Sequence, residues 1–507
     1  MFNQNSKTMK TLKRLFLLIA ATGLLFSCSK YDQFDSDMYD KSCKDPNWHP
    51  IGMEKLFVVK PGGVDDTEVL SKSFDEAIKY GPRAVVQLVE GEYHLNFIEI
   101  REFIGKFQGA GKGKTIITTI DDLDVDALIS ENLNTVLIRF VGGDVHMGDM
   151  TIKTPPGLLS TGSESGIDGL VGFSAYTYQT YENRSGNEYI NAVINNVDFA
   201  GHWDNCGYGL KAEFGCRSGV KVSGGYPLSN TNITITNCLF KDFLYSGALI
   251  WHIKDGKINV GTKNNGNVFN NIKAEHTSSS VGYGSLGIWM NVNVEISIVD
   301  NTFQLDYDRN FGIDLWRAPY PAFLEQVPQT KATICNIEKN LFNITGGAGG
   351  IKMNDRRRYF SPSEVPMLVQ VKNNLFNMGN DADVGIECVC MSGTIIRNNK
   401  FTGNGSYGVL ITTDGFFNEG KQNYNENGLM LGNNFSNTTY SIATVLLNER
   451  SRNWTIVGGD LGENIIDNGT NNIITGFNNN TSEIPLGQTI VDNLEEMREA
   501  LDDWDEQ

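Results

Sequence analysis

A short phrase recurs along the chain between about residue 190 and residue 435: an apolar residue, a polar pair rich in Asn, one further residue, and then Phe. Its copies end at Phe199, Phe240, Phe269, Phe303, Phe342, Phe376, Phe401 and Phe435. The copies lie 25 to 41 residues apart, so the shortest spacing approximates one bare unit and the longer ones require insertions. A unit of this size cannot bury its own Phe, so the units must stack on one another. The phrase therefore predicts a solenoid.

A second phrase follows most copies and reads Gly, aliphatic, any residue, aliphatic. It begins at Gly287, Gly312, Gly350, Gly385 and Gly408. Alternation with a period of two indicates strands that turn one face inward. Asn suits the tight turn before each Phe because it tolerates the left-handed backbone conformation, and stacked Asn side chains would form a ladder. An antiparallel sandwich or a propeller explains the irregular spacing between fixed phrases less well.

Both phrases resemble those of the pectin-lyase-like superfamily of right-handed parallel β-helices, and the resemblance covers most of residues 55–480. In that family the Asn and Phe phrase is the second strand, sharp turn and third strand, and the Gly phrase is the first strand. Asp66 and Thr67 precede an amphipathic segment that carries Phe74, Ala77 and Ile78 on one face, and the family has a capping helix here. The resemblance implies an all-β chain with one right-handed parallel β-helix over residues 55–485 and an N-terminal capping helix.

The N-terminus has the pattern of an export signal. Basic residues precede an apolar run over residues 15–26, which is too short to span a membrane as a helix. The run ends at Leu25-Phe26-Ser27-Cys28, which resembles the lipobox of bacterial lipoproteins. That resemblance implies cleavage after residue 27, acylation of Cys28, and anchoring in a lipid membrane. Because Ser29 replaces the Asp that marks inner-membrane retention, it implies the outer membrane, on the cell surface or the periplasmic face. The alternative is an ordinary signal with an incidental Cys.

Two further segments flank the predicted solenoid. Residues 28–54 include a polar stretch rich in Asp and Lys, which indicates a flexible tether. Residues 486–507 place Leu494, Met497, Leu501 and Trp504 on one face of an expected amphipathic helix. We expect this C-terminal helix to cover the last coil. A helix that binds a partner is the alternative.

The charge of the chain and the spacing of its cysteines disfavour nucleic acid and zinc as ligands. A formal net charge of −18 disfavours nucleic acid, and a polyanion would need a local basic patch. The cysteines show no zinc spacing, and Cys206 and Cys216 have a spacing that neither requires nor excludes a disulfide. Residues 122–126 resemble the start of a calcium loop, but Ala127 and Leu133 replace its Gly and its bidentate Glu. We therefore predict no cofactor, and calcium remains an alternative for which the sequence offers no clear site.

Alignment of the Gly phrases predicts two outward columns on the first strands. The column two residues after Gly reads Leu249, Trp289, Asp314, Lys352, Glu387 and Leu410, and the next reads Trp251, Asn291, Trp316, Asn354, Val389 and Thr412. Asp314 and Glu387 would lie two coils apart, roughly 9 to 10 Å between backbones. This separation is near that of the two carboxyl groups in inverting glycosidases. Asp314, Lys352 and Glu387 are thus the candidate catalytic residues. The alternative is a ladder of ion pairs on a solvated face.

The same strands carry candidate substrate-binding residues. Indoles on an exposed sheet indicate either a surface that stacks on sugar rings or side chains that pack beneath a loop. Both interpretations are open for Trp251, Trp289 and Trp316. The strand ends add Arg317, Asn354, Arg356 and Arg357. Arg side chains bind uronate or sulfate groups bidentately, as a lyase would need, and the alternative is pairing with neighbouring acids.

The function favoured by these features is cleavage of a complex polysaccharide by a glycoside hydrolase or a polysaccharide lyase. The motifs of polygalacturonases and the calcium site of pectate lyases do not occur in the sequence, which disfavours a specific pectinase. A non-catalytic glycan-binding or adhesion scaffold with the same indole-bearing face is the alternative.

Overall fold

The computed structural model describes residues 54–121, 123, 136–155, 169–175, 189–201, 216–223, 230–273, 284–289, 291–307, 310–317, 331–355, 366–413, 424–460 and 464–475. The chain divides into residues 1–53 and residues 54–507, and only the second unit contains described residues. The predicted signal, lipidation at Cys28, most of the tether and the C-terminal helix therefore lie outside the described ranges. Within those ranges, no helix has the length and apolar character needed to cross a membrane.

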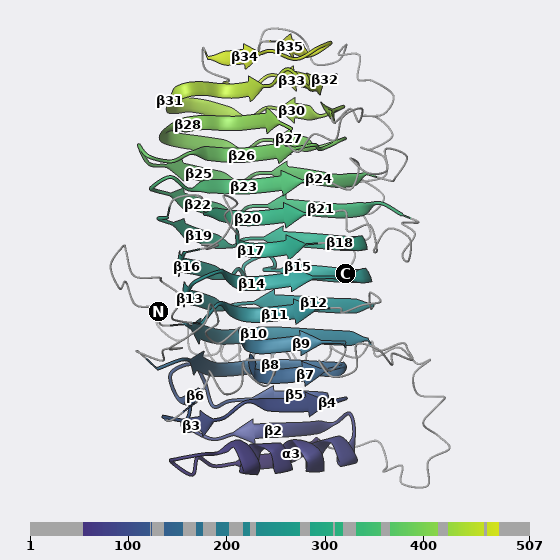
Figure 1. Cartoon of the computed structure of the whole chain (residues 1–507), viewed down its shortest axis with the longest axis vertical. Coiled ribbons are helices and arrows are strands. Elements are labelled where there is room, and N and C mark those ends of the chain that lie inside the picture. Colours follow the sequence, from purple (N-terminus) through teal and green to yellow (C-terminus); the bar gives the residue numbers. More distant parts are fainter. Residues whose placement is uncertain are drawn as a thin grey trace, which may run out of the picture. The chain divides into compact units, whose positions relative to one another are not determined.

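The second unit is a stack of coils of three strands each, joined by parallel pairing (Figure 1). Almost every strand pairs with the strand three places later in the chain, so the coils form three long parallel sheets. The predicted parallel β-helix is confirmed.

The first sheet carries the Gly phrase. It contains β4 (Ile98–Arg101), β7 (Val136–Val141), β9 (Gly169–Ser174), β11 (Ser218–Ser223), β14 (Ser246–Trp251), β17 (Gly284–Trp289), β20 (Phe311–Trp316), β23 (Gly349–Asn354), β26 (Val384–Val389), the later halves of β28 (Lys400–Thr412) and β31 (Asn434–Leu447), and β34 (Ile465–Asp467).

The second and third sheets complete the coil. The second contains β1 (Lys55–Val59), β2 (Ala84–Leu88), β5 (Ile104–Gln108), β8 (Gly143–Lys153), β10 (Ile190–Ala200), β12 (Thr231–Thr236), β15 (Lys254–Val260), β18 (Val292–Val299), β21 (Thr333–Glu338), β24 (Met367–Lys372), β27 (Ile395–Arg397), β30 (Leu429–Leu431), β33 (Thr455–Val457) and β35 (Ile473–Thr475). The third contains β3 (Gly91–Leu95), β6 (Thr115–Thr119), β13 (Leu239–Phe243), β16 (Val268–Ile272), β19 (Thr302–Leu305), β22 (Leu341–Ile344), β25 (Leu375–Met378) and the remaining parts of β8, β10, β28 and β31. A short ladder joins β29 (Asn425–Glu426) to β32 (Ser451–Arg452).

Helix α3 (Thr67–Tyr80) lies at the N-terminal end of this stack (Figure 1). It buries Leu70, Phe74 and Ala77. The Phe74 ring packs against Phe103, Phe107 and Phe140, with centroids 5.1 to 5.8 Å apart. Apolar side chains that would face water at an open solenoid end are therefore covered, and the predicted capping helix is confirmed.

The interior is organised around a stack of phenylalanine rings. Each ring belongs to the Phe that ends one copy of the first phrase. Adjacent rings from Phe199 to Phe435 lie 4.3 to 5.1 Å apart at 5° to 14°. The Gly of the second phrase faces this stack. A Cβ added to Gly350 would lie 2.5 Å from the Gly385 carbonyl oxygen and 2.7 Å from Phe376 Cε1. The phrase requires Gly because a neighbouring ring and backbone occupy the space of a side chain.

Beside the phenylalanines runs a ladder of buried asparagines: Asn267, Asn301, Asn340, Asn374, Asn399 and Asn433. Asn340 is typical, since its Nδ2 donates to the Ile298 carbonyl at 2.9 Å and to Asn374 Oδ1 at 3.0 Å. Its Oδ1 accepts the Asn301 backbone N–H at 2.9 Å. The residue before it, Lys339, has φ of 56°. The predicted ladder is confirmed, and the neighbouring residue adopts the left-handed conformation of the turn.

Candidate functional site

The first sheet brings the three candidate catalytic residues into one column. Asp314, Lys352 and Glu387 are register partners on β20, β23 and β26. The outward column reads Glu99, Arg139, Gly172, Lys221, Leu249, Gly287, Asp314, Lys352, Glu387, Leu410 and Leu446. The sequence therefore correctly placed these three side chains next to one another.

The expected position of Trp289 in that column was wrong. In β17, Leu286 pairs with Ile313, so Gly287 occupies the column of Asp314, and Trp289 lies opposite Trp316. The alignment failed because Ser285 takes the place of the usual Gly while a second Gly follows two residues later. Trp251, Trp289 and Trp316 consequently occupy one column on three successive coils, and Asn291 follows the strand.

Gly287 leaves room for a contact between the two columns. A Cβ at this position would lie 3.3 Å from Trp289 Cε2, so the indole lies over the glycine. Trp289 Nε1 donates a hydrogen bond of 3.0 Å to Asp314 Oδ2. The Asp314 side chain is nearly buried, and Trp289 also meets Trp316 edge to face with centroids 5.8 Å apart. The Trp289 indole thus orients one of the two candidate carboxyl groups.

Lys352 and Glu387 form the more accessible half of the site. Lys352 Nζ lies 3.4 Å from Glu387 Oε2, and the two side chains are 20% and 17% exposed. The ammonium group also lies 5.0 Å from the centroid of the Phe311 ring, where the ring quadrupole attracts a cation. Within the described residues, Lys352 forms no ion pair with Asp314. The ion-pair ladder considered from the sequence is therefore formed only between Lys352 and Glu387.

Trp251 extends the site by one coil toward the N-terminus. Lys221 Nζ lies 5.1 Å from its ring centroid, and the His252 ring stacks on it at 5.1 Å with an angle of 2°. Burial lowers the pKa of His252 to about 4, so the imidazole is neutral at pH 7. Trp251 Nε1 is buried and has no hydrogen-bond partner in the described part of the chain.

Arg317, a candidate substrate-binding residue, is buried and paired. Its Nε lies 2.7 Å from Asp355 Oδ1, its Nη2 lies 2.9 Å from Asp355 Oδ2, and the two side chains are 2% and 0% exposed. Asp355 Oδ2 also accepts the backbone N–H of Met367 at 3.1 Å. The guanidinium thus links the end of β20 to the end of β23, and it is buried. Sequence reasoning missed Asp355, although its position directly after Asn354 places it beside Arg317.

The other candidate residues divide between described and undescribed parts of the chain. Asn354 is buried, and its Oδ1 has no hydrogen-bond partner among the described residues. Arg356 and Arg357 lie outside the described ranges, as does most of the calcium-like segment at residues 122–126. Cys216 is buried and Cys206 lies outside these ranges. Among described residues, no group of three or more His, Cys, Asp or Glu side chains has a metal-binding arrangement.

No family model and no curated protein sequence matches this chain. The chain is similar in structure to the A-module of the Azotobacter vinelandii mannuronan C-5 epimerase AlgE4, at 15% identity and a TM-score of 0.47 over 83% of this chain and 96% of that one. It is similar to the catalytic unit of a GH87 α-1,3-glucanase from Streptomyces thermodiastaticus, at 11% identity and 0.46 over 87% and 72%. A third similar structure is the surface adhesin PfbA of Streptococcus pneumoniae, at 12% identity and 0.39 over 76% and 89%. All three identities lie below 25% and all three TM-scores lie below 0.5, so these likenesses support no statement about the activity or the ligand of this chain.

Proposed function

We propose that the first sheet binds a complex polysaccharide and that Asp314, Lys352 and Glu387 act in its cleavage. The observation that carries this proposal is the register of β20, β23 and β26, which places two carboxyl groups and one ammonium group in a single column. The neighbouring column supplies Trp251 and Trp316, both partly exposed indoles. Apolar indole faces stack on sugar rings while charged groups act on the bond between them.

Hydrolysis with inversion is the reaction that fits these positions best. Asp314 and Glu387 lie two strands apart, roughly 9 to 10 Å between backbones. An inverting glycosidase separates its acid and its base by roughly 6.5 to 9.5 Å so that water fits between the sugar and the base. In this proposal the Trp289 indole fixes the orientation of Asp314, and Lys352 positions Glu387. A lyase would instead use Lys352 to abstract the proton beside a uronate carboxyl group.

A non-catalytic glycan-binding scaffold is the second candidate. It is favoured by the near burial of Asp314 and by the ion pair between Lys352 and Glu387, since both carboxyl groups already have partners. On this reading the indoles bind the glycan and the charges maintain the sheet.

A polysaccharide panel separates the candidates. Purified protein is incubated with neutral, uronate-containing and sulfated polysaccharides while reducing ends and the absorbance of unsaturated uronates are followed. The hydrolase proposal expects reducing ends without absorbance, and loss of at least a hundredfold in rate for Asp314→Asn and Glu387→Gln. Glu99→Gln, in the same column at its far end, is the matched control. Binding without either product would favour the scaffold, and full activity in both variants would refute the catalytic assignment.

We further propose that the chain is an outer-membrane lipoprotein anchored through Cys28. Support comes from the basic residues, the apolar run and the Cys that ends it. Metabolic labelling with palmitate in an expressing bacterium, followed by membrane fractionation, tests this. The expected result is a labelled protein in the outer-membrane fraction and an unlabelled Cys28→Ala variant. Equal labelling of both would contradict it.

A further inference from the structure

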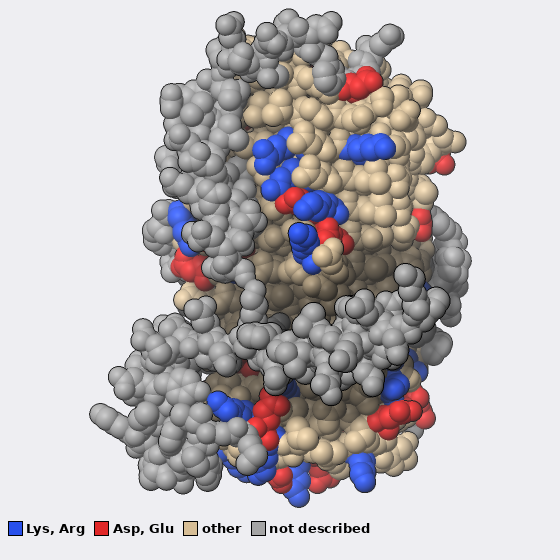
Figure 2. Space-filling model, turned by 180° about the vertical axis from the view of Figure 1, so that it is seen from behind, with Lys and Arg blue, Asp and Glu red and all other residues tan. Residues whose placement is uncertain are grey.

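Charge is distributed unevenly over the described surface. Figure 2 shows basic and acidic side chains gathered in a short run on an otherwise mostly uncharged part of one face. The formal net charge of the chain is −18, so its bulk field repels anions. A site for an anion must therefore arise from local geometry, and the second sheet contains one candidate.

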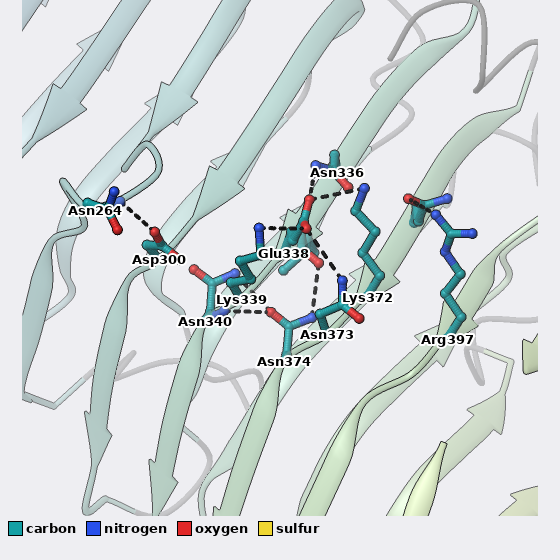
Figure 3. Close-up of polar contacts among 12 residues, drawn as sticks. Asn264, Asp300, Asn336, Glu338, Lys339, Asn340, Lys372, Asn373, Asn374 and Arg397 are labelled. Carbon is teal, nitrogen blue, oxygen red and sulfur yellow. Dashed lines mark hydrogen bonds and ion pairs between the residues drawn. The ribbon is translucent and has the colours of Figure 1, made fainter. Parts of the chain in front are cut away.

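An outward column of the second sheet holds Glu338, Lys372 and Arg397 as register partners on β21, β24 and β27. Lys339 follows Glu338 in the turn (Figure 3). Neighbouring strands are about 4.8 Å apart, so these side chains lie within reach of one another. We call these four residues the second-sheet cluster. It contains three cations and one anion.

Glu338 is fully engaged by its neighbours. Its carboxylate lies 3.0 Å from Lys372 Nζ and 3.2 Å from Lys339 Nζ. It also accepts hydrogen bonds from Asn373 at 3.4 Å and Asn336 at 3.5 Å (Figure 3). Burial tends to raise the pKa of Glu338, but the hydrogen bonds and charge of Lys372 and Lys339 outweigh burial and lower it. The only carboxylate of the cluster is thus occupied by the lysines.

Among the described residues, Arg397 has no acceptor of comparable strength. Its Nη2 donates a long hydrogen bond of 3.4 Å to Gln370 Oε1. Its Nε is buried and has no hydrogen-bond partner in the described part of the chain. A guanidinium carries five N–H donors and keeps its charge at any physiological pH. Leaving a buried N–H without an acceptor is unfavourable, whereas an oxyanion with two oxygens on one central atom can pair bidentately with a guanidinium.

We propose that Lys372 and Arg397, with Lys339 at the edge, bind the sulfate group of a ligand. This site lies on a different sheet from Asp314 and Glu387, so it stands independently of the proposed polysaccharide cleavage. The ligand is an oxyanion, either a free ion or a group carried on a glycan chain. Glu338 competes with it for the lysines and sets the affinity.

Three probes test the ligand class at low ionic strength, where screening is weak. Dextran sulfate carries the anion on a polymer, sodium sulfate supplies it free, and neutral dextran carries none. Binding is measured by isothermal titration and by the shift of the unfolding temperature. Saturable binding of dextran sulfate alone indicates a glycan-borne anion, and binding of both sulfates indicates the free ion. Equal binding of neutral dextran, or no binding of either sulfate, would overturn the proposal.

Variants locate the site within the cluster. Arg397→Gln is expected to weaken sulfate binding about tenfold, as the loss of one charged hydrogen-bond pair implies. Arg101→Gln removes the same charge from an exposed side chain in the first sheet and is the matched control. Equal affinities in these two variants would contradict the assignment.

Glu338→Gln supplies a test in the opposite direction. Removing the internal carboxylate releases Lys339 and Lys372, so sulfate binding should strengthen several-fold. A merely structural cluster would show unchanged or weaker binding in this variant. Because a gain of affinity requires a folded protein, this result does not depend on whether Arg397→Gln folds.

Discussion

At the scale of single residues, the asparagine ladder concentrates stability in buried amides. Replacing Asn340 by Ala removes the acceptor of the Asn301 N–H and the donors to Ile298 and Asn374. Each buried group left unsatisfied costs about 1 to 3 kcal/mol. We expect Asn340→Ala to lower the free energy of unfolding by about 3 kcal/mol or more in chemical denaturation. Asn343→Ala, on the outer face of the same coil, is the control, and an equal loss there would contradict the ladder's role.

The glycine that faces the phenylalanine stack makes a second prediction. In Gly350→Ala the new methyl group meets the Gly385 carbonyl and the Phe376 ring at distances that real Cβ atoms do not show. Overpacking of this kind costs roughly 1 to 3 kcal/mol. Gly169→Ala is the matched control because its Cβ would meet nothing closer than 3.5 Å. Calorimetry should show a lower unfolding temperature for Gly350→Ala only, and equal temperatures would contradict the contact.

His252 makes the stability of the fold depend on pH. Burial lowers its pKa from 6.5 to about 4, so the unfolded chain takes up a proton at a pH where the folded chain does not. The free energy of unfolding is therefore highest above pH 6.5. It decreases as the pH falls toward 4, by up to roughly 3 kcal/mol. Asn tolerates the φ of 62° found here and does not titrate. The free energy of unfolding should therefore fall less steeply in His252→Asn, and parallel pH profiles would refute this.

At the scale of elements, the ion pair between Arg317 and Asp355 fastens the ends of β20 and β23 to the start of β24. Removing one partner leaves an uncompensated buried charge, at a cost of about 3 to 5 kcal/mol. Asp355→Asn should destabilise by that amount in denaturant titrations. The double variant Arg317→Met with Asp355→Leu should lose less than Asp355→Asn does. If Arg317 instead bound substrate, Arg317→Met would weaken glycan binding while stability stayed unchanged.

The sequence predicted the elements of the fold well because its two phrases each have a physical cause. Every Asn of the ladder and every Phe of the stack needs an identical partner one coil away, so the same residue types recur at readable positions. Register within a strand is less well determined. Gly287 and Ser285 are both small residues two positions apart, and only the pairing of β17 with β20 decides between them.

The candidate site could be predicted only in part for a related reason. The column of Asp314, Lys352 and Glu387 follows from strand alignment alone. The hydrogen bond from Trp289 depends on an indole that lies over a glycine, and the burial of Arg317 depends on a partner from the next coil. Such contacts depend on side-chain direction, which the period of the sequence does not encode.

At the scale of the solenoid, its two ends differ. Helix α3 covers the first coil and buries Phe74 completely among core rings. On β35, Ile474 pairs with the fully buried Ile456, yet it is 39% exposed, and its neighbour Ile473 is 37% exposed. The inward-facing Ile474 of the last described coil therefore still exposes apolar surface, which another segment would bury with a gain in stability.

We expect residues 486–507 to provide that cover through Leu494, Met497, Leu501 and Trp504, which share one helical face. The double variant Leu494→Ala with Leu501→Ala removes two large apolar side chains from this face. If they pack on the last coil, the loss should be at least about 2 kcal/mol in the free energy of unfolding. Hydrogen exchange should then rise first in β33 and β35, because terminal repeats depend on their caps.

The control removes charge from the opposite face of the same expected helix. Glu499→Gln with Asp503→Asn leaves the apolar residues intact, so stability should change by less than about 0.5 kcal/mol. Equal behaviour of the two double variants would mean that the segment does not cover the solenoid. A partner-binding helix gives a third pattern, since the alanine variant would then retain its stability and its slow exchange in β33 and β35. The exchange rates of these two strands thus distinguish an intramolecular cap from a docking segment.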